Sequence, residues 1–366
     1  MEGKFRQHML RLAAAAALCL VVTSCGTERT INKVMLVHTL GYDVTGSKVK
    51  GSVLLGDYRK KGEVDATLLQ TEAESEFEIL PKLNAKTKSP IEIGQLGVIV
   101  FGSEFSRSHG VSTTMKNLCR DTRISTNMKL AVAEHEAFDL MKAAKSFQDA
   151  YLLSDMINQN MTHGNLPYQN LHLSLFQYYG PGRDMFLPHI VLDEKEPMVD
   201  GLALFRGDKY VTKINMNESL LIKMLTENAR NGTYAVSLKL TGSKKIPLLI
   251  QVVSSKTRYD AVREPKEAIS IHLSLQVRIE EIPKHTEYRS SGLISDLEKK
   301  LAVYFEDEIG KILKKCREHK VDPVGLEDQY NRKVLKAHAG TKKENPSAFQ
   351  TDVTVDVNII RTGFKQ

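Results

Sequence analysis

The first candidates for chemistry are histidines that lie close to carboxylates or to one another in the sequence. His135 and Glu136 begin like the helical zinc motif H-E-x-x-H, but Asp139 stands where the second histidine is required. Among the 11 His residues no two are spaced i, i+4, and the chain has no C-x-x-C pair. Structural or exposed histidines therefore explain the sequence better than a metal site does.

Two other patterns could suggest catalysis, and neither completes a known site. Asp193, Glu194 and Glu196 lie as close together as an acid/base pair would, but an exposed acidic loop explains them without chemistry. The Gly-Pro-Gly run at 180–182 lacks the third glycine of the dinucleotide-binding pattern, and neither a P-loop nor a G-x-S-x-G motif occurs. We therefore predict a protein that is not an enzyme, with no catalytic, cofactor-binding or metal-binding residues.

One cysteine near the start has the surroundings that covalent lipidation needs. Lys4, Arg6 and Arg11 precede or flank an uncharged, mostly apolar run at 12–22. This run has the length of a signal-peptide core, whereas a transmembrane helix needs about 18 or more residues. Small residues then lead into Cys25, a pattern similar to the lipobox of bacterial lipoproteins, in which the thiol receives a diacylglyceryl group.

Cleavage in front of Cys25 would remove residues 1–24, and the new N-terminus could then be N-acylated. Two acyl chains hold a protein on a bilayer, whereas one chain does so only marginally. The longest later apolar run, 246–253, is too short to span a membrane and contains Gln251. We therefore predict an extracytoplasmic body held at the membrane by lipid alone. The alternative is an ordinary secretory signal with a chance cysteine.

Composition and charge are those of a packed globular protein. The 366 residues suggest two or three domains at about 150 residues each, with 42% hydrophobic and 26% charged residues. The net charge of +7 is spread along the chain, which argues against nucleic acid as the partner. Cys119 and Cys316 both fall in predicted helices, and Cys316 extends an apolar stripe, which is typical of a buried thiol. The sequence does not decide whether the two cysteines form a disulfide.

Apolar periodicity predicts a mixed α/β region in the first half of the chain. Pro81 interrupts one of its helices, and a polar, glycine-containing loop is predicted at 56–66. The predicted strands are 34–42, 48–55, 95–101 and 128–133, and the predicted helices are 71–86, 104–109, 112–120 and 134–145.

The second half has clearer patterns. A long amphipathic helix is predicted near 293–320, and alternating residues predict half-buried, antiparallel strands at 271–279 and 353–361, the last at a sheet edge. The other predicted elements are a hairpin of 198–205 with 209–214 and a helix at 218–230, capped by Asn217. The predicted domains are the signal peptide 1–24, an α/β region 25–200 of one or two subdomains with the 198–214 hairpin at its boundary, and an α+β domain 201–366.

Several sequence blocks occur in an order that resembles one known family. After the lipobox at Cys25 come V-H-T-L-G-Y-D, G-Q-L-G-V-I-V-F-G-S-E-F, L-C-R-D, L-P, G-L-A-L-F-R-G-D-K, D-P-V-G and a closing I-x-x-x-G strand. They begin at residues 37, 94, 118, 187, 201, 322 and 359. This set is similar to the Ger(x)C family, the lipoprotein C subunits of spore germinant receptors. The hairpin block and the D-P-V-G block are the most specific.

The resemblance implies a multi-subdomain α/β protein of unusual topology, with mixed and antiparallel sheets. It implies a lipid-anchored subunit on the outer face of the spore inner membrane, required for nutrient-triggered germination. Its partners would be two integral membrane subunits, A and B, and it would act by assembly and not by catalysis. Binding of a small-molecule germinant by this subunit stays open, as does the identity of the nutrient.

A second class of protein carries the same kind of anchor. Substrate-binding lipoproteins of ABC-type transporters are usually built from two lobes of parallel βαβ units with a cleft between them. The alternating strands at 271–279 and 353–359 are predicted to be antiparallel and half-exposed, which disfavours that alternative.

Overall fold

The structure is a computed structural model that describes residues 8–9, 34–60, 63–239, 245–262, 267–281, 291–334 and 350–362. Contacts group the chain into two units, Met1–Val34 and Met35–Gln366, and the elements below belong to the second. Cys25 lies outside the described residues. Within the described part, no helix combines the length and the apolarity that a membrane crossing requires.

The first sheet has nine strands, in the order β3-β2-β1-β5-β6-β7-β8-β9, with β4 paired to β1. The neighbours β1, β5, β6 and β7 run parallel, whereas the pairs on both flanks are antiparallel. The strands are β1 (Met35–Thr45), β2 (Lys48–Lys60), β3 (Glu63–Ala73), β4 (Ile91–Glu92), β5 (Val98–Phe101), β6 (Lys129–Ala133), β7 (Phe186–Asp193), β8 (Glu196–Arg206) and β9 (Lys209–Asn215).

Helices cover both faces of this sheet, because its central strands are apolar on both sides. In β5, Val98 and Val100 belong to one buried cluster, and Ile99 and Phe101 to the other. The short helices are η2 (Glu76–Glu78), α2 (Ile79–Asn84), η3 (Phe105–His109), α3 (Ser112–Arg120), α4 (Ala137–Ser146), α5 (Leu152–Thr162), α6 (Leu171–Tyr179) and α7 (Met216–Thr226).

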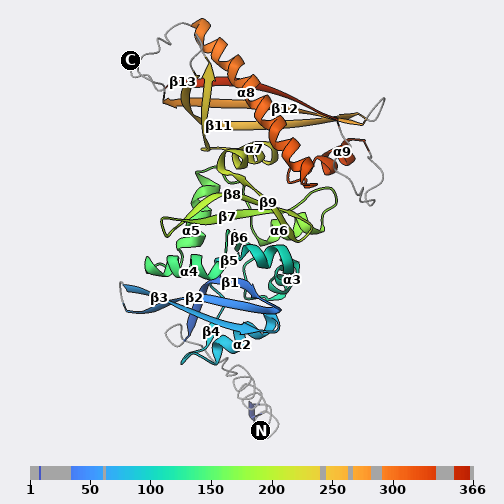
Figure 1. The fold of residues 1–366 in the computed structure, drawn as a ribbon. Helices are drawn as coiled ribbons and strands as arrows, with labels where there is room; N and C mark the ends of the chain where they lie inside the picture. The colour runs from blue at the N-terminus through green and yellow to red at the C-terminus, as the bar shows by residue number, and fades with distance from the viewer. Residues whose placement is uncertain are drawn as a thin grey trace. The chain divides into compact units, whose positions relative to one another are not determined.

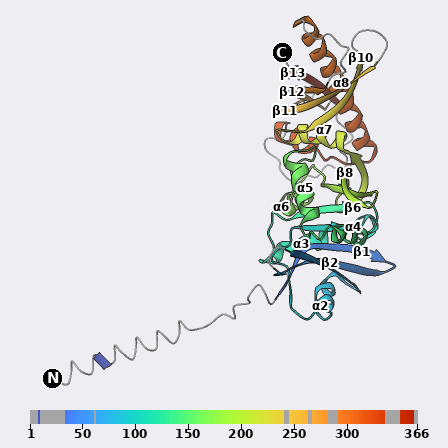
Figure 2. The same ribbon diagram turned by 90° about the vertical axis from the view of Figure 1, so that its left-hand side faces the viewer.

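The second sheet has four strands, in the order β10-β11-β12-β13. Figure 2 shows β11, β12 and β13 side by side with a long helix, α8 (Ser291–Glu318), across them. The other elements are β10 (Thr233–Lys239), β11 (Lys245–Val262), β12 (Ala268–Glu281), α9 (Leu326–Val334) and β13 (Gln350–Thr362). In Figure 1, α7 lies between the two sheets, and it contacts β8 and β9 as well as β10 and β11.

The predicted fold class is confirmed: the chain is α+β with mixed sheets, a long amphipathic helix and a C-terminal edge strand. The strand direction at that edge was predicted wrongly. β12 pairs antiparallel with β11 but parallel with β13. Alternation of apolar residues shows which face of a strand is buried, but it does not show whether the strand runs parallel or antiparallel to its neighbour. The parallel pairing therefore could not be predicted from periodicity.

Three local predictions were wrong in whole or in part. Within the predicted loop 56–66, residues 56–60 end β2 and residues 63–66 begin β3. The predicted helix 71–86 is helical only at 76–84, as η2 and the short α2, because residues 71–73 belong to β3. β3 is an edge strand rich in polar residues, and such a strand gives little hydrophobic signal. The helix predicted at 218–230 is α7, which Asn215 caps in place of Asn217.

Two other sequence expectations concern cysteines and domains. Cys119 is exposed and Cys316 is buried, and both are free, so the disulfide between them is absent. Residues 200 and 201, on either side of the predicted domain boundary, both lie within β8. Separate folding of the two predicted domains stays a prediction.

Candidate functional site

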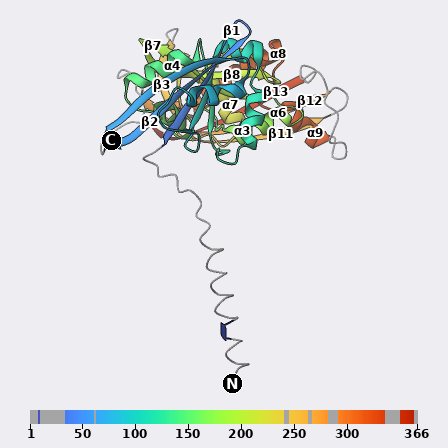
Figure 3. The same cartoon turned by 90° about the horizontal axis from the view of Figure 1, so that it is seen from below.

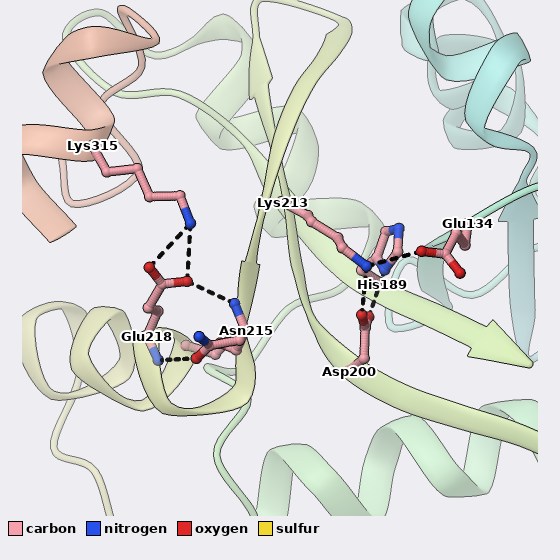
Figure 4. A network of polar contacts seen from close by, with 8 residues as sticks. Glu134, His189, Asp200, Lys213, Asn215, Glu218 and Lys315 are labelled. Atoms are coloured by element: carbon pink, nitrogen blue, oxygen red, sulfur yellow. Dashed lines mark hydrogen bonds and ion pairs between the residues drawn. The ribbon is translucent and has the colours of Figure 1, made fainter. Parts of the chain in front are cut away.

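A network of charged side chains lies across the β7–β8–β9 end of the first sheet (Figure 4). His189 Nδ1 on β7 lies 2.5 Å from Asp200 Oδ1 on β8. Lys213 Nζ on β9 donates to Asp200 Oδ2 at 2.8 Å and to Glu134 Oε1 at 3.0 Å. Glu134 directly follows β6, so the four residues join four consecutive strands.

A β-bulge places Asp200 in this network. The β7–β8 register pairs His189 with Gly201 and Ile190 with Val199, which leaves Asp200 as the extra residue. Gly201 has φ +152°, and a Cβ there would lie 1.8 Å from the carbonyl oxygen of Ile214. Only glycine fits this position, so the first residue of the G-x-A-x-F block is the one that allows the bulge.

The electrostatics of the network favour ion pairs. Burial acts to raise the pKa of Asp200, but the hydrogen bonds to His189 and Lys213 outweigh it and hold that pKa below its usual value. Burial acts to lower the pKa of Lys213, and its contacts with Asp200 and Glu134 raise it on balance. Both groups are therefore charged at neutral pH.

The imidazole of this network is enclosed by the protein. His189 is only 1% exposed, so a substrate has no access to its ring. No set of three or more residues that could hold a metal ion occurs among the described residues. What the arrangement does is fasten β7, β8 and β9 to the end of β6.

A second polar link in Figure 4 joins the first sheet to α8. The Asn215 side chain accepts from Glu218 N at 2.9 Å, and Glu218 Oε2 accepts from Asn215 N at 2.8 Å, which is a capping box at the start of α7. Lys315 Nζ on α8 donates to both carboxylate oxygens of Glu218, at 3.0 and 3.1 Å. Glu218 thus caps the N-terminus of α7 and also forms an ion pair with α8.

The G-Y-D block ends in Asp43, a buried carboxylate on β1 that caps the N-terminus of α4. Asp43 on β1 accepts hydrogen bonds from the backbone N–H groups of Ala137 (2.7 Å) and Phe138 (3.0 Å), at the start of α4. Burial raises the pKa of Asp43 to about 6, although these two bonds act to lower it. A Cβ at Gly102 would lie 2.1 Å from Asp43 Oδ1, so the glycine makes room for the carboxylate.

In the D-P-V-G block, between α8 and α9, the buried Asp322 carboxylate likewise accepts hydrogen bonds from backbone N–H groups. Asp322 accepts from Gly325 N at 2.7 Å and from Glu327 N at 3.0 Å, and Gly325 takes the left-handed φ of +77°. Asp322 N donates to Asp184 Oδ2, and Asp184 N donates to Asp322 O, both at 2.8 Å. The turn after α8 is thereby attached to the segment just before β7.

The structure does not bring the sequence candidates together. His135 and Glu136 are exposed in front of α4, and Asp139 is exposed in its first turn. The three carboxylates of the acidic cluster lie in or beside the exposed β7–β8 turn: Asp193, Glu194 and Glu196.

Sequence reasoning missed the charged network at β7–β9. Its members are far apart in the chain and follow no motif spacing, so only Gly201 gave a signal, as part of the hairpin block. No metal or cofactor site was predicted, and the lipidation of Cys25 stays a prediction because that residue lies outside the described part.

Comparison with known proteins identifies the class that these blocks and this fold define. The family model "Spore germination protein N-terminal domain" matches residues 27–192, and "Spore germination B3/GerAC like, C-terminal" matches residues 200–363. The spore germination protein GerQC of Bacillus cereus is 26% identical over 350 residues, which are 94% of this chain and 97% of that protein.

A solved structure has the same fold. The crystal structure of the GerBC protein superposes with a TM-score of 0.54 at 18% identity, covering 87% of this chain and 96% of that chain. The chain belongs to the Ger(x)C family of spore germinant receptor subunits.

Proposed function

We propose that this chain is a lipoprotein subunit of a spore germinant receptor, required for nutrient-triggered germination. Cys25 anchors it to the outer face of the spore inner membrane. There it assembles with the integral membrane subunits A and B, and it contributes contacts and not chemistry to the complex.

The observation that carries this proposal is the family match, which extends through both halves of the chain. The use of the buried charged groups supports a non-catalytic role. Asp43 and Asp322 cap helices, and Asp200 and Lys213 join strands. A catalytic group needs an open side towards its substrate, and these groups already have partners within the protein.

The transporter alternative is less well supported. The parallel β12–β13 pair removes one argument against it, because that pair was predicted to be antiparallel. The first sheet, however, is mixed, with antiparallel flanks around four parallel neighbours, and such a sheet differs from a lobe of parallel βαβ units. Membership of the Ger(x)C family favours the receptor.

Cys25→Ala tests the anchor and the role together. Two acyl chains supply the proposed membrane binding, so the variant should move from the membrane to the soluble fraction. The fractionation should be done in cells without subunits A and B, since binding to them would mask the loss. Spores that carry only this variant should germinate on nutrients like spores from which the gene is deleted.

The matched control is Cys119→Ala, which removes an exposed thiol from the folded body. It should leave both fractionation and germination at wild-type levels. Full membrane retention of Cys25→Ala would contradict the lipid anchor. Unchanged germination of the deletion strain on every nutrient tested would contradict the proposed role.

A further inference from the structure

Helix α6 has an unusual distribution of polar and aromatic residues. Its sequence, LHLSLFQYY, is apolar nearly all round, and a helix of that kind is normally covered on every side. Yet Ser174 is 0% and Gln177 only 9% exposed, whereas Phe176 is 51% and Tyr179 65% exposed. The most buried positions therefore include polar groups while two large rings face outwards.

Internal hydrogen bonds explain the buried polar groups of α6. Ser174 Oγ donates to the carbonyl oxygen of Asn170 at 2.8 Å, and Gln177 Oε1 accepts from Gln169 Nε2 at 2.7 Å. The first bond lies within the first turn of the helix, and the second joins Gln177 to the buried Gln169, which keeps the Gln177 side of the helix inwards. The exposed aromatic stripe is His172, Phe176 and Tyr179, spaced i, i+4, i+7. The guanidinium carbon of Arg183 lies 5.7 Å from the ring centre of Phe176, yet that side chain stays 51% exposed.

Cations lie beside this stripe. Helix α3 packs against α6 (Figure 3), and Lys116 Nζ on α3 lies 5.0 Å from the ring centre of Tyr178 and 5.7 Å from that of Tyr179. Arg120 follows one helical turn later and is exposed. Among the described residues, no carboxylate forms an ion pair with Lys116 or Arg120.

We propose that this aromatic–cationic face, defined by Lys116, Arg120, Phe176 and Tyr179, docks a segment of a partner protein that carries apolar side chains next to carboxylates. The apolar side chains would cover the two rings, and the carboxylates would supply the missing partners of the two cations. The proposal rests on the proposed function, because the partner is taken to be a protein of the same membrane complex.

The composition of the face favours a protein over a lipid surface. Tyr, Phe and Arg are enriched at the centres of protein interfaces, where rigid rings bury a large area at low entropic cost. Each Lys or Arg near an anionic membrane surface adds only a small favourable free energy, so two cations form a weak membrane site. A crosslink to lipid alone would indicate a membrane site instead.

Site-specific photocrosslinking in intact spores tests the proposal. A benzophenone amino acid in place of Phe176 keeps an aromatic ring on the face. The control is the same replacement at Phe147, which is 47% exposed after α4 and lies outside the face. We expect illumination to give a protein adduct from position 176 and none from position 147, with the crosslinked peptide of the partner rich in Asp or Glu.

Charge reversal identifies the role of the cations. Lys116→Glu with Arg120→Glu in the position-176 background should lower the adduct yield at least tenfold. Because Arg120 is exposed and Lys116 is half-buried with no ion-pair partner in the described part of the chain, the melting temperature of the purified Lys116→Glu/Arg120→Glu variant should match that of the wild type. That measurement separates loss of docking from loss of folding in the variant whose adduct yield is compared.

Four outcomes would overturn the docking proposal: no adduct from position 176, an adduct with lipid only, equal adducts from position 147, or a yield that charge reversal leaves unchanged. Each of these can occur while the deletion strain still fails to germinate, and then the proposed function stands without this face. If the deletion strain germinates normally, the proposed function fails, and a specific acidic protein adduct would still support the docking face.

Discussion

Three residues of the family blocks have roles in positioning the backbone. Asp43 and Asp322 cap helices with buried carboxylates, and Gly201 permits the bulge that turns Asp200 towards His189. The sequence showed that these blocks were special, because glycine and aspartate at fixed places are typical of turns and caps. It could not show their partners, which come from segments far along the chain, such as the start of α4 for Asp43.

The carboxyl group of Asp322 should make stability depend on pH. Burial raises its pKa from the model-compound value of 3.8 to about 6, and the nearby Asp184 adds to this, although three backbone N–H bonds oppose it. The folded state therefore holds the proton more tightly than the unfolded state. The contribution of this group to stability is full below about pH 4 and is lost as the pH rises through 6.

Asp322→Asn removes the titrating carboxyl group and keeps a side chain of nearly the same size and shape. The whole pKa shift corresponds to about 3 kcal/mol, at about 1.4 kcal/mol per pKa unit. Part of it is already lost at pH 4, where the unfolded carboxyl is partly ionised, so the free energy of unfolding of the wild type, minus that of the variant, should fall by about 2 kcal/mol between pH 4 and pH 7. Urea unfolding at several pH values measures it. Asp352→Asn, on the exposed face of β13, controls for removal of a carboxyl group. A difference that rises with pH would contradict the assignment.

At the scale of elements, α8 has two roles. Its buried stripe, which includes Leu301, Phe305 and Ile309, packs on the second sheet. Its flank protects the edge of that sheet: Glu306 Oε1 accepts from Val355 N and Glu298 Oε1 accepts from Ile359 N, both at 2.9 Å. Outward-facing N–H groups on β13 thus find acceptors inside the protein instead of another strand.

The stripe gives a sharp stability prediction. Leu301→Asp places a charge where the side chain is fully buried and should lower the free energy of unfolding by on the order of 3–5 kcal/mol. Val303→Asp is the matched control, because Val303 lies on the same helix and is 57% exposed. Thermal melting compares the two. Equal melting temperatures would mean that the stripe is an exposed surface and not a core.

Elements with strong periodicity were predictable, and elements set by tertiary contacts were not. Apolar residues at every fourth position predicted α8 close to its observed bounds, and the alternation of β12 was equally clear. β3 was missed because its polar edge is stabilised from outside, by Lys86 Nζ on the carbonyl oxygen of Gln70 at 2.8 Å and by Lys82 Nζ on that of Glu72 at 3.3 Å. The charged network at β7–β9 was missed because its residues are far apart in the chain and meet only through tertiary contacts.

At the scale of the whole molecule, both sheets contribute to one buried cluster that includes much of α7. Polar links lie around this shared core. Besides Glu218 with Lys315 and Asp184 with Asp322, Arg183 Nη2 donates to Asp328 Oδ2 at 2.8 Å. Glu218 and Lys315 both belong to the part matched by the C-terminal family model. The parts matched by the two family models are therefore joined by apolar packing and by the Asp184–Asp322 and Arg183–Asp328 contacts.

A double-mutant cycle on Glu218→Gln and Lys315→Met measures one of these links. The pair is partly buried and bidentate, so we expect a coupling free energy of about 1 kcal/mol in urea unfolding at low salt. The exposed pair Glu308–Lys311, within α8, is the control and should show a smaller coupling. Zero coupling at Glu218–Lys315 would mean that packing alone joins α7 to α8.

The parallel pairing of β12 with β13 has a consequence for the order of folding. Paired residues such as Ile271 and Val353 are separated by about 80 positions of chain, which includes α8 and α9. A parallel pair cannot form through a tight turn, and closing so long a loop delays it relative to the local hairpins. Until β13 arrives, β12 presents an open edge, and this interval is when a newly made chain is most prone to aggregate.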